Sequence, residues 1–298
     1  MNLSPAKINL GLKILSKRSD GYHSIESIFI KLDFGDLIEV LTTPGSDSQF
    51  ILQSKNDLNG RRRHLFESVS ERGDLTKNIF WKVYVKLQPY FLEPLHIHVN
   101  LEKRIPPEGG IGGGSSNAGS LIKSLLPLCR KEAKTLLWHE IVGADVPFFL
   151  QDSHAFVTGI GEILEPIPLA KGWGVLAVPE ISLPTAEMFQ SLQKDLQETP
   201  PSRPWKSLGD EVVGSLQTGD WKGLRGHLKN DFEEIACRNE PSLLAIRDSF
   251  LDLEVDFASL SGSGSCLYGL VSSYERSQSL KAKMQSIFPD LAFHSFSF

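Results

Sequence analysis

The sequence is poor in cysteine. Among 298 residues there are three, Cys129, Cys237 and Cys266, and no C-x-x-C pair occurs. Disulfide-stapled secreted domains and zinc ribbons depend on paired, closely spaced cysteines. The cysteine content therefore argues against both scaffolds and favours a reducing compartment.

Long apolar runs and leader-like segments are missing as well. No run reaches the roughly 18 apolar residues that a membrane-spanning helix needs. The residues after Met1 show no basic stretch followed by an apolar one. We therefore expect a cytoplasmic protein without a membrane partner.

An excess of basic residues is also absent, since the formal net charge is -5. A nucleic-acid partner is not expected, because a phosphate backbone binds a basic protein face. The one dense basic cluster, Arg61–His64, has acidic and amide neighbours and no interleaved aromatic residues. We interpret this cluster as part of a solvated loop.

The residues that are present suffice for a packed core, since 41% are hydrophobic and 22% charged. Strand and helix patterns mix along the chain, which predicts two α+β domains. Strands are predicted at 8–15, 28–41 with a turn at 33–36, 95–101, 173–178 and, as the last strand, 266–271, with strand and turn at 146–161. One helix is predicted from residue 78 to Pro89, and a second one directly after the glycine-rich run at 109–114. Further helices are predicted at 211–217, 220–236, 241–251 and 274–287. Loops are predicted at 42–76 and around Pro200, Pro201 and Pro204.

Residues 95–101 alternate most regularly between apolar and polar side chains, so His96 and His98 share one strand face. With no third ligand in view, we interpret both as solvent-facing or packed against a helix rather than as metal ligands.

The strongest chemical signal is the glycine-rich run Gly109–Gly114, followed by Ser115, Ser116 and Asn117. It lies between a predicted strand and a predicted helix, which Ser115 or Ser116 is expected to cap. Glycines permit positive φ and close approach to a ligand, and a helix N-terminus favours phosphate. Neither G-x-x-x-x-G-K-[ST] nor G-x-G-x-x-G occurs. A flexible linker is the alternative, but it would not run directly into two serines and an apolar helical stripe.

At this point a family resemblance emerges from four motifs. Pro106 with Gly109–Ala118 resembles the ATP motif of the GHMP kinases, the galacto-, homoserine, mevalonate and phosphomevalonate kinases. The segments 5–10 and 17–23 resemble the opening signature of the branch that acts on a cytidyl diphosphate substrate. Gly143–Phe149 and Leu260–Cys266 resemble two further family motifs. All four occur in the family order, with looser similarity between them.

The resemblance implies an α+β, two-domain GHMP kinase fold. Residues 1–165 would form an N-terminal domain like ribosomal protein S5 domain 2, and residues 166–298 a ferredoxin-like C-terminal domain. The implied activity is ATP-dependent phosphorylation of the 2-hydroxyl of 4-diphosphocytidyl-2-C-methyl-D-erythritol, a step toward isoprenoid precursors. ATP with Mg²⁺ and this small molecule are the implied ligands.

The resemblance also implies two catalytic residues. Asp145 would be the base that accepts the hydroxyl proton, and Lys7 would keep it ionised and stabilise charge on the transferred phosphoryl group. Taken alone, Asp145 is typical of a helix cap or turn, and Lys7 of a snorkelling edge residue.

Further site residues follow from the same motifs. The implied substrate-binding residues are Asn9, Tyr22, His23, Thr185, Phe189, Gly262, Ser263 and Gly264. The implied nucleotide-binding residues are Asn78, Lys103, Gly110, Gly112, Gly113, Gly114, Ser115, Ser116 and Asn117. Ser115 or Ser116 would reach magnesium.

Three residues depart from the family pattern, of which Ile111, in place of a leucine, is a mild change. Glu108 places a carboxylate beside the phosphate loop, and Gly119 replaces an alanine, which weakens a helix by roughly 1 kcal/mol. Other hypotheses are another GHMP kinase, of the homoserine or phosphomevalonate type, and a non-catalytic nucleotide- or RNA-binding protein on the same fold.

Overall fold

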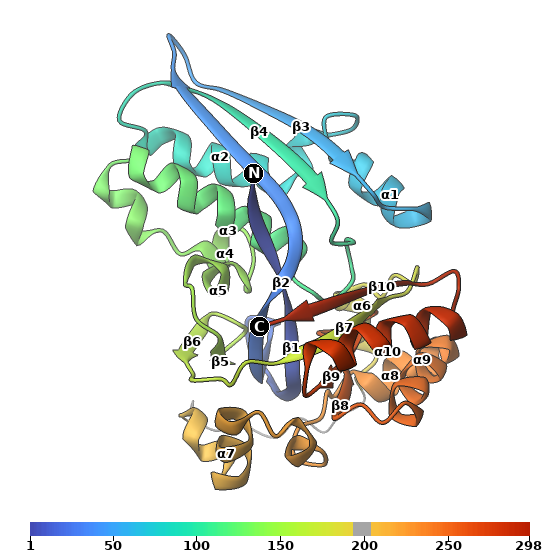
Figure 1. Cartoon of the computed structure of the whole chain (residues 1–298). Helices are drawn as coiled ribbons and strands as arrows, with labels where there is room; N and C mark the ends of the chain where they lie inside the picture. The colour runs from blue at the N-terminus through green and yellow to red at the C-terminus, as the bar shows by residue number, and fades with distance from the viewer. Residues whose placement is uncertain (193–203) are drawn as a thin grey trace. The chain divides into compact units, whose positions relative to one another are not determined.

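The computed structural model describes residues 1–192 and 204–298, and the chain forms two compact units (Figure 1). Unit 1 consists of Met1–Ala6, Gly35–Pro107 and Gly112–Asp152. Unit 2 consists of Lys7–Phe34, Glu108–Ile111 and Ser153–Phe298. The units interleave along the chain. The predicted domain boundary at residue 165 stays a prediction, because each compact unit contains several separate segments of the chain.

Strands β1 (Asn2–Lys17) and β2 (His23–Pro44) pair with each other. The strand predicted at 8–15 is therefore confirmed and extends at both ends. The turn predicted at 33–36 is wrong, because β2 continues through it. Gly35 is required for packing instead, since a Cβ there would lie 2.2 Å from the main-chain oxygen of Ser4.

In unit 1 the strands lie in the order β3 (Gln49–Asn56), β4 (Leu95–Lys103) and the second half of β2. β4 pairs in parallel with β3 and antiparallel with residues 37–44 of β2. The alternation predicted for 95–101 is confirmed, with its apolar side chains buried. The helices are α1 (Gly60–Glu67), α2 (Ile79–Leu87), α3 (Gly113–Leu125), α4 (Trp138–Ile141) and α5 (Val146–Leu150).

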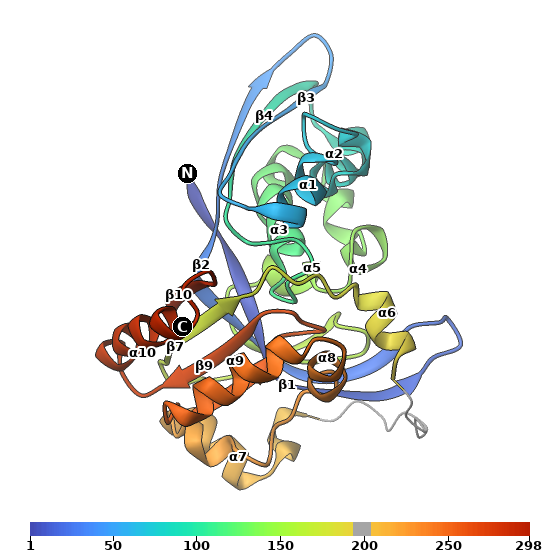
Figure 2. The same ribbon diagram turned by 90° about the vertical axis from the view of Figure 1, so that its right-hand side faces the viewer.

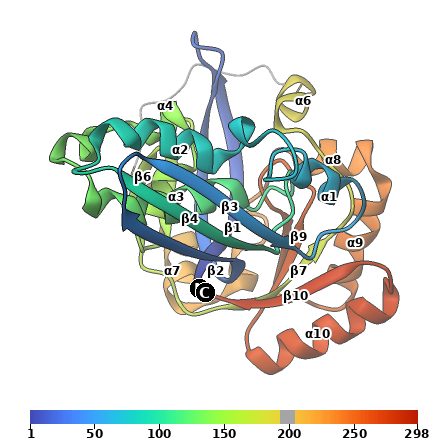
Figure 3. The same cartoon turned by 90° about the horizontal axis from the view of Figure 1, so that it is seen from above.

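The core of unit 1 lies between these strands and helices α2 and α3, which Figure 3 shows beside β3 and β4. The helix predicted from residue 78 is confirmed as α2, which has an apolar stripe of four buried residues. The loop predicted at 42–76 is wrong where β3 and α1 lie. The prediction for 146–161 is half right, because α5 precedes strand β5 (Ala155–Thr158).

In unit 2 an antiparallel sheet has the order β10 (Ala292–Ser297), β7 (Trp173–Val178), β9 (Leu267–Val271) and β8 (Phe257–Leu260). The first half of β2 pairs with β5, and β5 with β6 (Ile163–Pro166). The helices are α6 (Thr185–Gln190), α7 (Asp210–Thr218), α8 (Glu233–Asn239), α9 (Pro241–Asp252) and α10 (Tyr274–Ile287). Figure 2 shows α9 and α10 beside the sheet, and both pack against it.

Most elements predicted for this half of the chain are confirmed, namely the strands at 173–178 and 266–271 and the helices at 211–217, 241–251 and 274–287. The single helix predicted at 220–236 is wrong. A short 3₁₀ helix at Trp221–Leu224 and helix α8 flank a segment of turns, which forms an isolated bridge with Leu12 at Asn230. Strand 266–271 is not the last one, since β10 follows it. Pro200 and Pro201 of the predicted loop lie outside the described residues.

Among the described residues, no helix combines the length and the apolar character needed to cross a bilayer.

Candidate functional site

Lys7 and Asn9 lie side by side on strand β1 of unit 2. The Lys7 side chain is 4% exposed, its Nζ donates a hydrogen bond to Asn9 Oδ1, and Nζ lies 4.4 Å from the centroid of the Phe29 ring. A buried ammonium group needs polar or π partners to offset its lost hydration. The shared strand face predicted for Lys7 and Asn9 is confirmed. A snorkelling edge lysine is not compatible with this burial.

Asn9 is itself held by further hydrogen bonds. Its Nδ2 donates to Ser27 Oγ at 2.9 Å, and the Tyr268 hydroxyl donates to its main-chain oxygen at 2.8 Å. Burial raises the pKa of Tyr268 well above its usual value, so the phenol keeps its proton and stays a donor. The lysine–asparagine pair is therefore held in place by other groups of the protein.

The late glycine motif contacts the start of the phosphate loop within unit 2. Gly110 has φ +74°, and a Cβ there would lie 2.1 Å from the Ser261 main-chain oxygen. Ser261 Oγ donates to the Gly110 oxygen at 3.0 Å, and the Cys266 amide donates to the Gly109 oxygen at 3.1 Å. The two glycine-rich segments thus meet main chain to main chain, which only glycine permits at this distance.

The residues predicted for cytidine recognition form two contacts. The rings of His23 and Phe189 stack with centroids 4.6 Å apart, and Thr185 Oγ1 lies 2.9 Å from Ser263 Oγ. Burial and the nearby Lys17 lower the pKa of His23, which favours the neutral ring. Tyr22 is 59% exposed, so its ring is open to a partner. Its stacking with a base stays a prediction.

The second part of the phosphate loop belongs to unit 1 and begins helix α3. Gly112, with φ +71°, is the N-cap, and the helix starts at Gly113. The prediction that Ser115 or Ser116 caps the helix is therefore wrong, because both lie inside its first turn. The amides at this end have no partner within the helix, as at every helix N-terminus, and can bind an anion.

The two serines differ in their surroundings. Ser116 is completely buried, and its Oγ lies 2.8 Å from Ser4 Oγ. Ser115 is half-buried. Asn117 accepts a hydrogen bond from Ser4 Oγ at 2.9 Å. Ser116 and Asn117 therefore hold the helix start in place, while Ser115 is the more accessible hydroxyl.

A buried carboxylate, Asp36, organises the same region and was missed by the sequence analysis. It is completely buried and accepts hydrogen bonds from Lys103 Nζ at 2.5 Å, from Asn117 Nδ2 at 2.9 Å, and from the main-chain amides of Arg104 and Ile105 at 2.7 Å each. Asp36 was not predicted as a buried residue because it was assigned to a turn at 33–36, where an aspartate is ordinarily exposed. Lys103 is thereby fixed beside the loop, and its contact with the nucleotide stays a prediction.

Asn78 and Asp145 lie at helix starts in unit 1. Asn78 caps α2 through Oδ1, which accepts from the Phe80 amide at 2.9 Å, and its Nδ2 donates to the Val69 oxygen at 2.8 Å. Asp145 occupies the N-cap position of α5, but its carboxylate makes no capping hydrogen bond. It is half-buried, and the cap position considered for it from sequence alone is the one that it occupies, without the capping hydrogen bond.

Lys7 belongs to unit 2 and Asp145 to unit 1, so their pairing stays a prediction.

The structure accounts for the departures from the family pattern at Glu108 and Gly119. Glu108 is exposed and accepts a hydrogen bond from Ser182 Oγ, so its carboxylate is directed to that hydroxyl. At Gly119, a Cβ would lie 2.7 Å from the Phe149 Cβ, so glycine lets α3 pack closely against α5.

Asn230 in unit 2 is another residue that the sequence analysis missed. Its segment was predicted to be the middle of a helix, and no glycine or motif marks it. The side chain is 6% exposed and binds the motif around Gly262, as described below.

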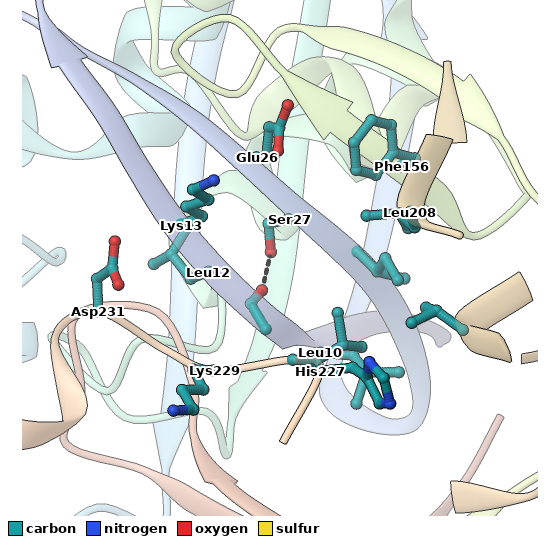
Figure 4. Close-up of a pocket in the computed structure, with 14 residues that line it drawn as sticks. Leu10, Leu12, Lys13, Glu26, Ser27, Phe156, Leu208, His227, Lys229 and Asp231 are labelled. Atoms are coloured by element: carbon teal, nitrogen blue, oxygen red, sulfur yellow. Dashed lines mark hydrogen bonds between the residues drawn. The ribbon is translucent and has the colours of Figure 1, made fainter. Parts of the chain in front are cut away.

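A cavity of about 330 Å³ lies on the β1–β2 hairpin of unit 2 (Figure 4). Its wall combines apolar side chains with ionisable ones from Lys13, Glu26, His227, Lys229 and Asp231. None of the predicted site residues lines it. The residues that the structure describes contain no cluster of three or more histidine, cysteine or acidic side chains arranged to hold a metal ion. His96 lies 3.5 Å from Asp47.

Comparison with known proteins identifies two family domains. The model described as "GHMP kinases N terminal domain" matches residues 78–152, and "GHMP kinases C terminal" matches residues 212–290. The first match contains the phosphate loop and Asp145. The second contains Asn230 and the late glycine motif.

Similar proteins extend over nearly the whole chain. A 4-diphosphocytidyl-2-C-methyl-D-erythritol kinase of Leptospira biflexa is 48% identical, over 99% of this chain and 98% of its own. One of Leptospira interrogans is 43% identical, over 99% of this chain and 100% of its own. The crystal structure of a 4-(cytidine 5'-diphospho)-2C-methyl-D-erythritol kinase is similar with a TM-score of 0.76 and 26% identity, covering 99% and 98% of the two chains.

Proposed function

Because the chain belongs to the GHMP kinase family, we propose that it transfers the γ-phosphoryl group of ATP to the 2-hydroxyl of 4-diphosphocytidyl-2-C-methyl-D-erythritol. The proposal depends mainly on one observation. The similarity to 4-diphosphocytidyl-2-C-methyl-D-erythritol kinases extends over almost the full length of this chain and of each of the two relatives. The match therefore includes the substrate-side segments as well as the ATP motif. The product would be the 2-phospho compound, on the route to isoprenoid precursors.

In the proposed reaction, the substrate hydroxyl oxygen forms a bond to the γ-phosphorus while the bond from that phosphorus to the ADP oxygen breaks. The hydroxyl proton passes to Asp145. The protein contributes mainly position and charge to such a transfer. Lys7 would contribute the charge, because a buried ammonium acts more strongly on a phosphoryl group than a solvated one.

The amides at the start of α3, with Gly110 before them, would bind the ATP phosphates. ATP enters as its magnesium complex, and Mg²⁺ takes most of its ligands from phosphate and water. One hydroxyl from the protein suits such an ion. Ser115 is our candidate, because Ser116 is completely buried against Ser4.

On the substrate side, Tyr22, His23 and Phe189 would bind the cytosine ring, and the motif at Gly262–Gly264 the substrate phosphates. Contacts among these residues within unit 2 support this assignment. His23 already stacks on Phe189, and Thr185 joins Ser263, so the residues proposed for the base and the phosphates are linked within unit 2.

The proposal is tested by incubating the purified chain with MgATP and each of three acceptors, namely the cytidyl compound, homoserine and phosphomevalonate. ADP release and product mass are followed. We expect turnover with the cytidyl compound alone, and ³¹P NMR should show a new phosphomonoester at its 2-position. Turnover of another acceptor, or ATP binding without transfer to any acceptor, would contradict the proposal.

A further inference from the structure

The segment Lys229–Asp231 joins two parts of unit 2 that carry predicted site residues. Its main chain runs beside strand β1, where the Leu12 amide donates to the Lys229 oxygen at 2.9 Å and the Asp231 amide donates to the Leu12 oxygen at 2.8 Å. Asp231 Oδ2 accepts from the Ile14 amide at 2.7 Å. Figure 4 shows Lys229 and Asp231 near Leu12 of β1. The segment is therefore fixed to the strand that contains Lys7 and Asn9.

The side chain of Asn230 points from this segment to the late glycine motif. Its Nδ2 donates two hydrogen bonds of 2.8 Å, one to the Leu260 oxygen and one to the Gly262 oxygen. Its Oδ1 accepts from the Phe232 amide at 2.9 Å. Both amide hydrogens meet carbonyl oxygens and the amide oxygen meets an N–H, so the orientation of the amide is unambiguous.

The carbonyl groups that Asn230 binds belong to a stretch of main chain that only glycine accommodates without strain. Gly262 and Gly264 have φ of +57° and +94°, and a Cβ on Gly262 would lie 2.8 Å from the Gly110 oxygen. Within the motif, the Gly264 amide donates to the Ser261 oxygen at 2.9 Å. Glycines have the greatest backbone freedom, so such a stretch keeps one conformation only when outside groups restrain it.

Several groups restrain the motif, among them Thr185, whose hydroxyl lies 2.9 Å from Ser263 Oγ. Ser261 Oγ binds Gly110 of the phosphate loop on one side, and Asn230 binds Gly262 on the other. Because the segment of Asn230 is also fixed to β1, its amide links the motif to the strand of Lys7, in addition to the hydrogen bond of 3.4 Å that the Asn9 amide donates to Ser261 Oγ. Serine or aspartate could accept from the Phe232 amide equally well, but neither can donate to two carbonyl groups.

We propose that Asn230 is a positioning residue that holds Gly262–Gly264 in the conformation that binds the phosphates of the cytidyl substrate. Asn230 acts through the glycine motif and needs no contact with either substrate. The inference rests on the proposed function for its kinetic readout, and the exchange measurement below is independent of that function.

Asn230→Ser is the first test, because its hydroxyl can still accept from the Phe232 amide while the double donation is lost. Asn230→Asp is the second, with the same shape and no amide hydrogens. Ser277→Ala is the matched control, since Ser277 is a buried residue whose hydroxyl donates a hydrogen bond of 2.7 Å to the Tyr274 oxygen at the start of α10.

In steady-state kinetics we expect both Asn230 variants to raise KM for the cytidyl substrate about tenfold, as loss of one or two buried hydrogen bonds predicts, and KM for MgATP less than about threefold. Ser277→Ala should lower thermal stability and leave both KM values within about twofold. A purely structural role for Asn230 would lower stability with no selective change in KM, and that result would overturn the proposal.

Hydrogen–deuterium exchange of the peptide covering 260–267 gives the second readout. Its amides should exchange faster in the Asn230 variants and at the wild-type rate in Ser277→Ala. If the wild type phosphorylates no cytidyl substrate but exchange rises in the variants, the proposed function fails and the restraint on the motif stands. Unchanged exchange in a folded Asn230→Ser protein would refute the restraint itself.

Discussion

At the scale of single residues, buried polar groups are the main features that the sequence did not reveal. Asp36 and Asn230 each bind several main-chain groups, yet neither occurs in a motif. Lys7 and Asn9 could be predicted, because a lysine and an asparagine two positions apart on an apolar strand share a face. Burial of a polar side chain depends on distant segments, which local patterns do not contain.

Asp145→Asn should lower kcat by at least about 100-fold, because the amide cannot accept the hydroxyl proton. The dissociation constant for MgATP should change less than about twofold, as measured by calorimetry. Asp152→Asn is the control, since Asp152 has the same side chain at 98% exposure in the same unit and should leave kcat unchanged. Wild-type turnover by Asp145→Asn would exclude Asp145 as the base.

Tyr22→Ala should raise KM for the cytidyl substrate roughly 5- to 100-fold, the range expected for loss of one base–aromatic stack, with little change for MgATP. Tyr274→Ala tests the effect of removing an equally exposed tyrosine, since the two side chains are 59% and 57% exposed. Equal increases for both substrates in Tyr22→Ala would contradict the stacking role.

His154 should make the stability of unit 2 depend on pH. Its Nδ1 accepts from the Lys31 amide at 3.2 Å, and burial together with Lys31 lowers its pKa below the usual 6.5. As the pH falls below 6.5, His154 therefore binds a proton more readily in the unfolded chain than in the folded one. The stability that the neutral, buried His154 contributes is present above pH 6.5 and is lost as the pH drops through the folded pKa.

Chemical denaturation at about pH 7.5 and about pH 5.5 measures this loss. His154→Asn retains an acceptor and cannot be protonated, so the decrease in unfolding free energy between the two pH values should be smaller than in the wild type. An identical decrease would assign the pH dependence to other groups.

At the scale of elements, regular alternation was the most reliable guide. Strand β4 and helices α2, α9 and α10 were predicted closely, because each buries one regular face. Strand β2 was predicted to break at residues 33–36, since glycine and aspartate are typical of turns. The structure uses Gly35 for close packing against Ser4 and Asp36 as a buried acceptor, and neither use can be read from neighbouring residues.

Gly110→Ala should destabilise the protein and weaken MgATP binding, because the added methyl group would meet the Ser261 oxygen. Gly226→Ala is the matched control. Gly226 has φ +82° but nothing within 4 Å of an added Cβ, so that variant has only the cost of the left-handed backbone, roughly 1–2 kcal/mol. Thermal denaturation and nucleotide titration should show a larger loss for Gly110→Ala, and equal losses would mean that close approach is unimportant.

At the scale of the whole molecule, four motifs predicted the family, and the comparisons confirm it. The two-domain α+β class was also predictable, because strand and helix patterns mix throughout the chain. The division of the chain into compact units was not, since Pro5–Leu10 and Gly109–Gly114 each pass from one unit to the other. No local pattern marks such a passage.

Interleaving also determines how the polypeptide can be divided. The core of unit 2 includes Leu12, Ile14 and Ile25, so a fragment of residues 153–298 lacks part of its own interior. Expressed alone, it should aggregate. Co-expression with residues 1–152, which supply the missing strands, should restore a soluble and active complex, making the junction after Asp152 a suitable place to build a split-enzyme reporter.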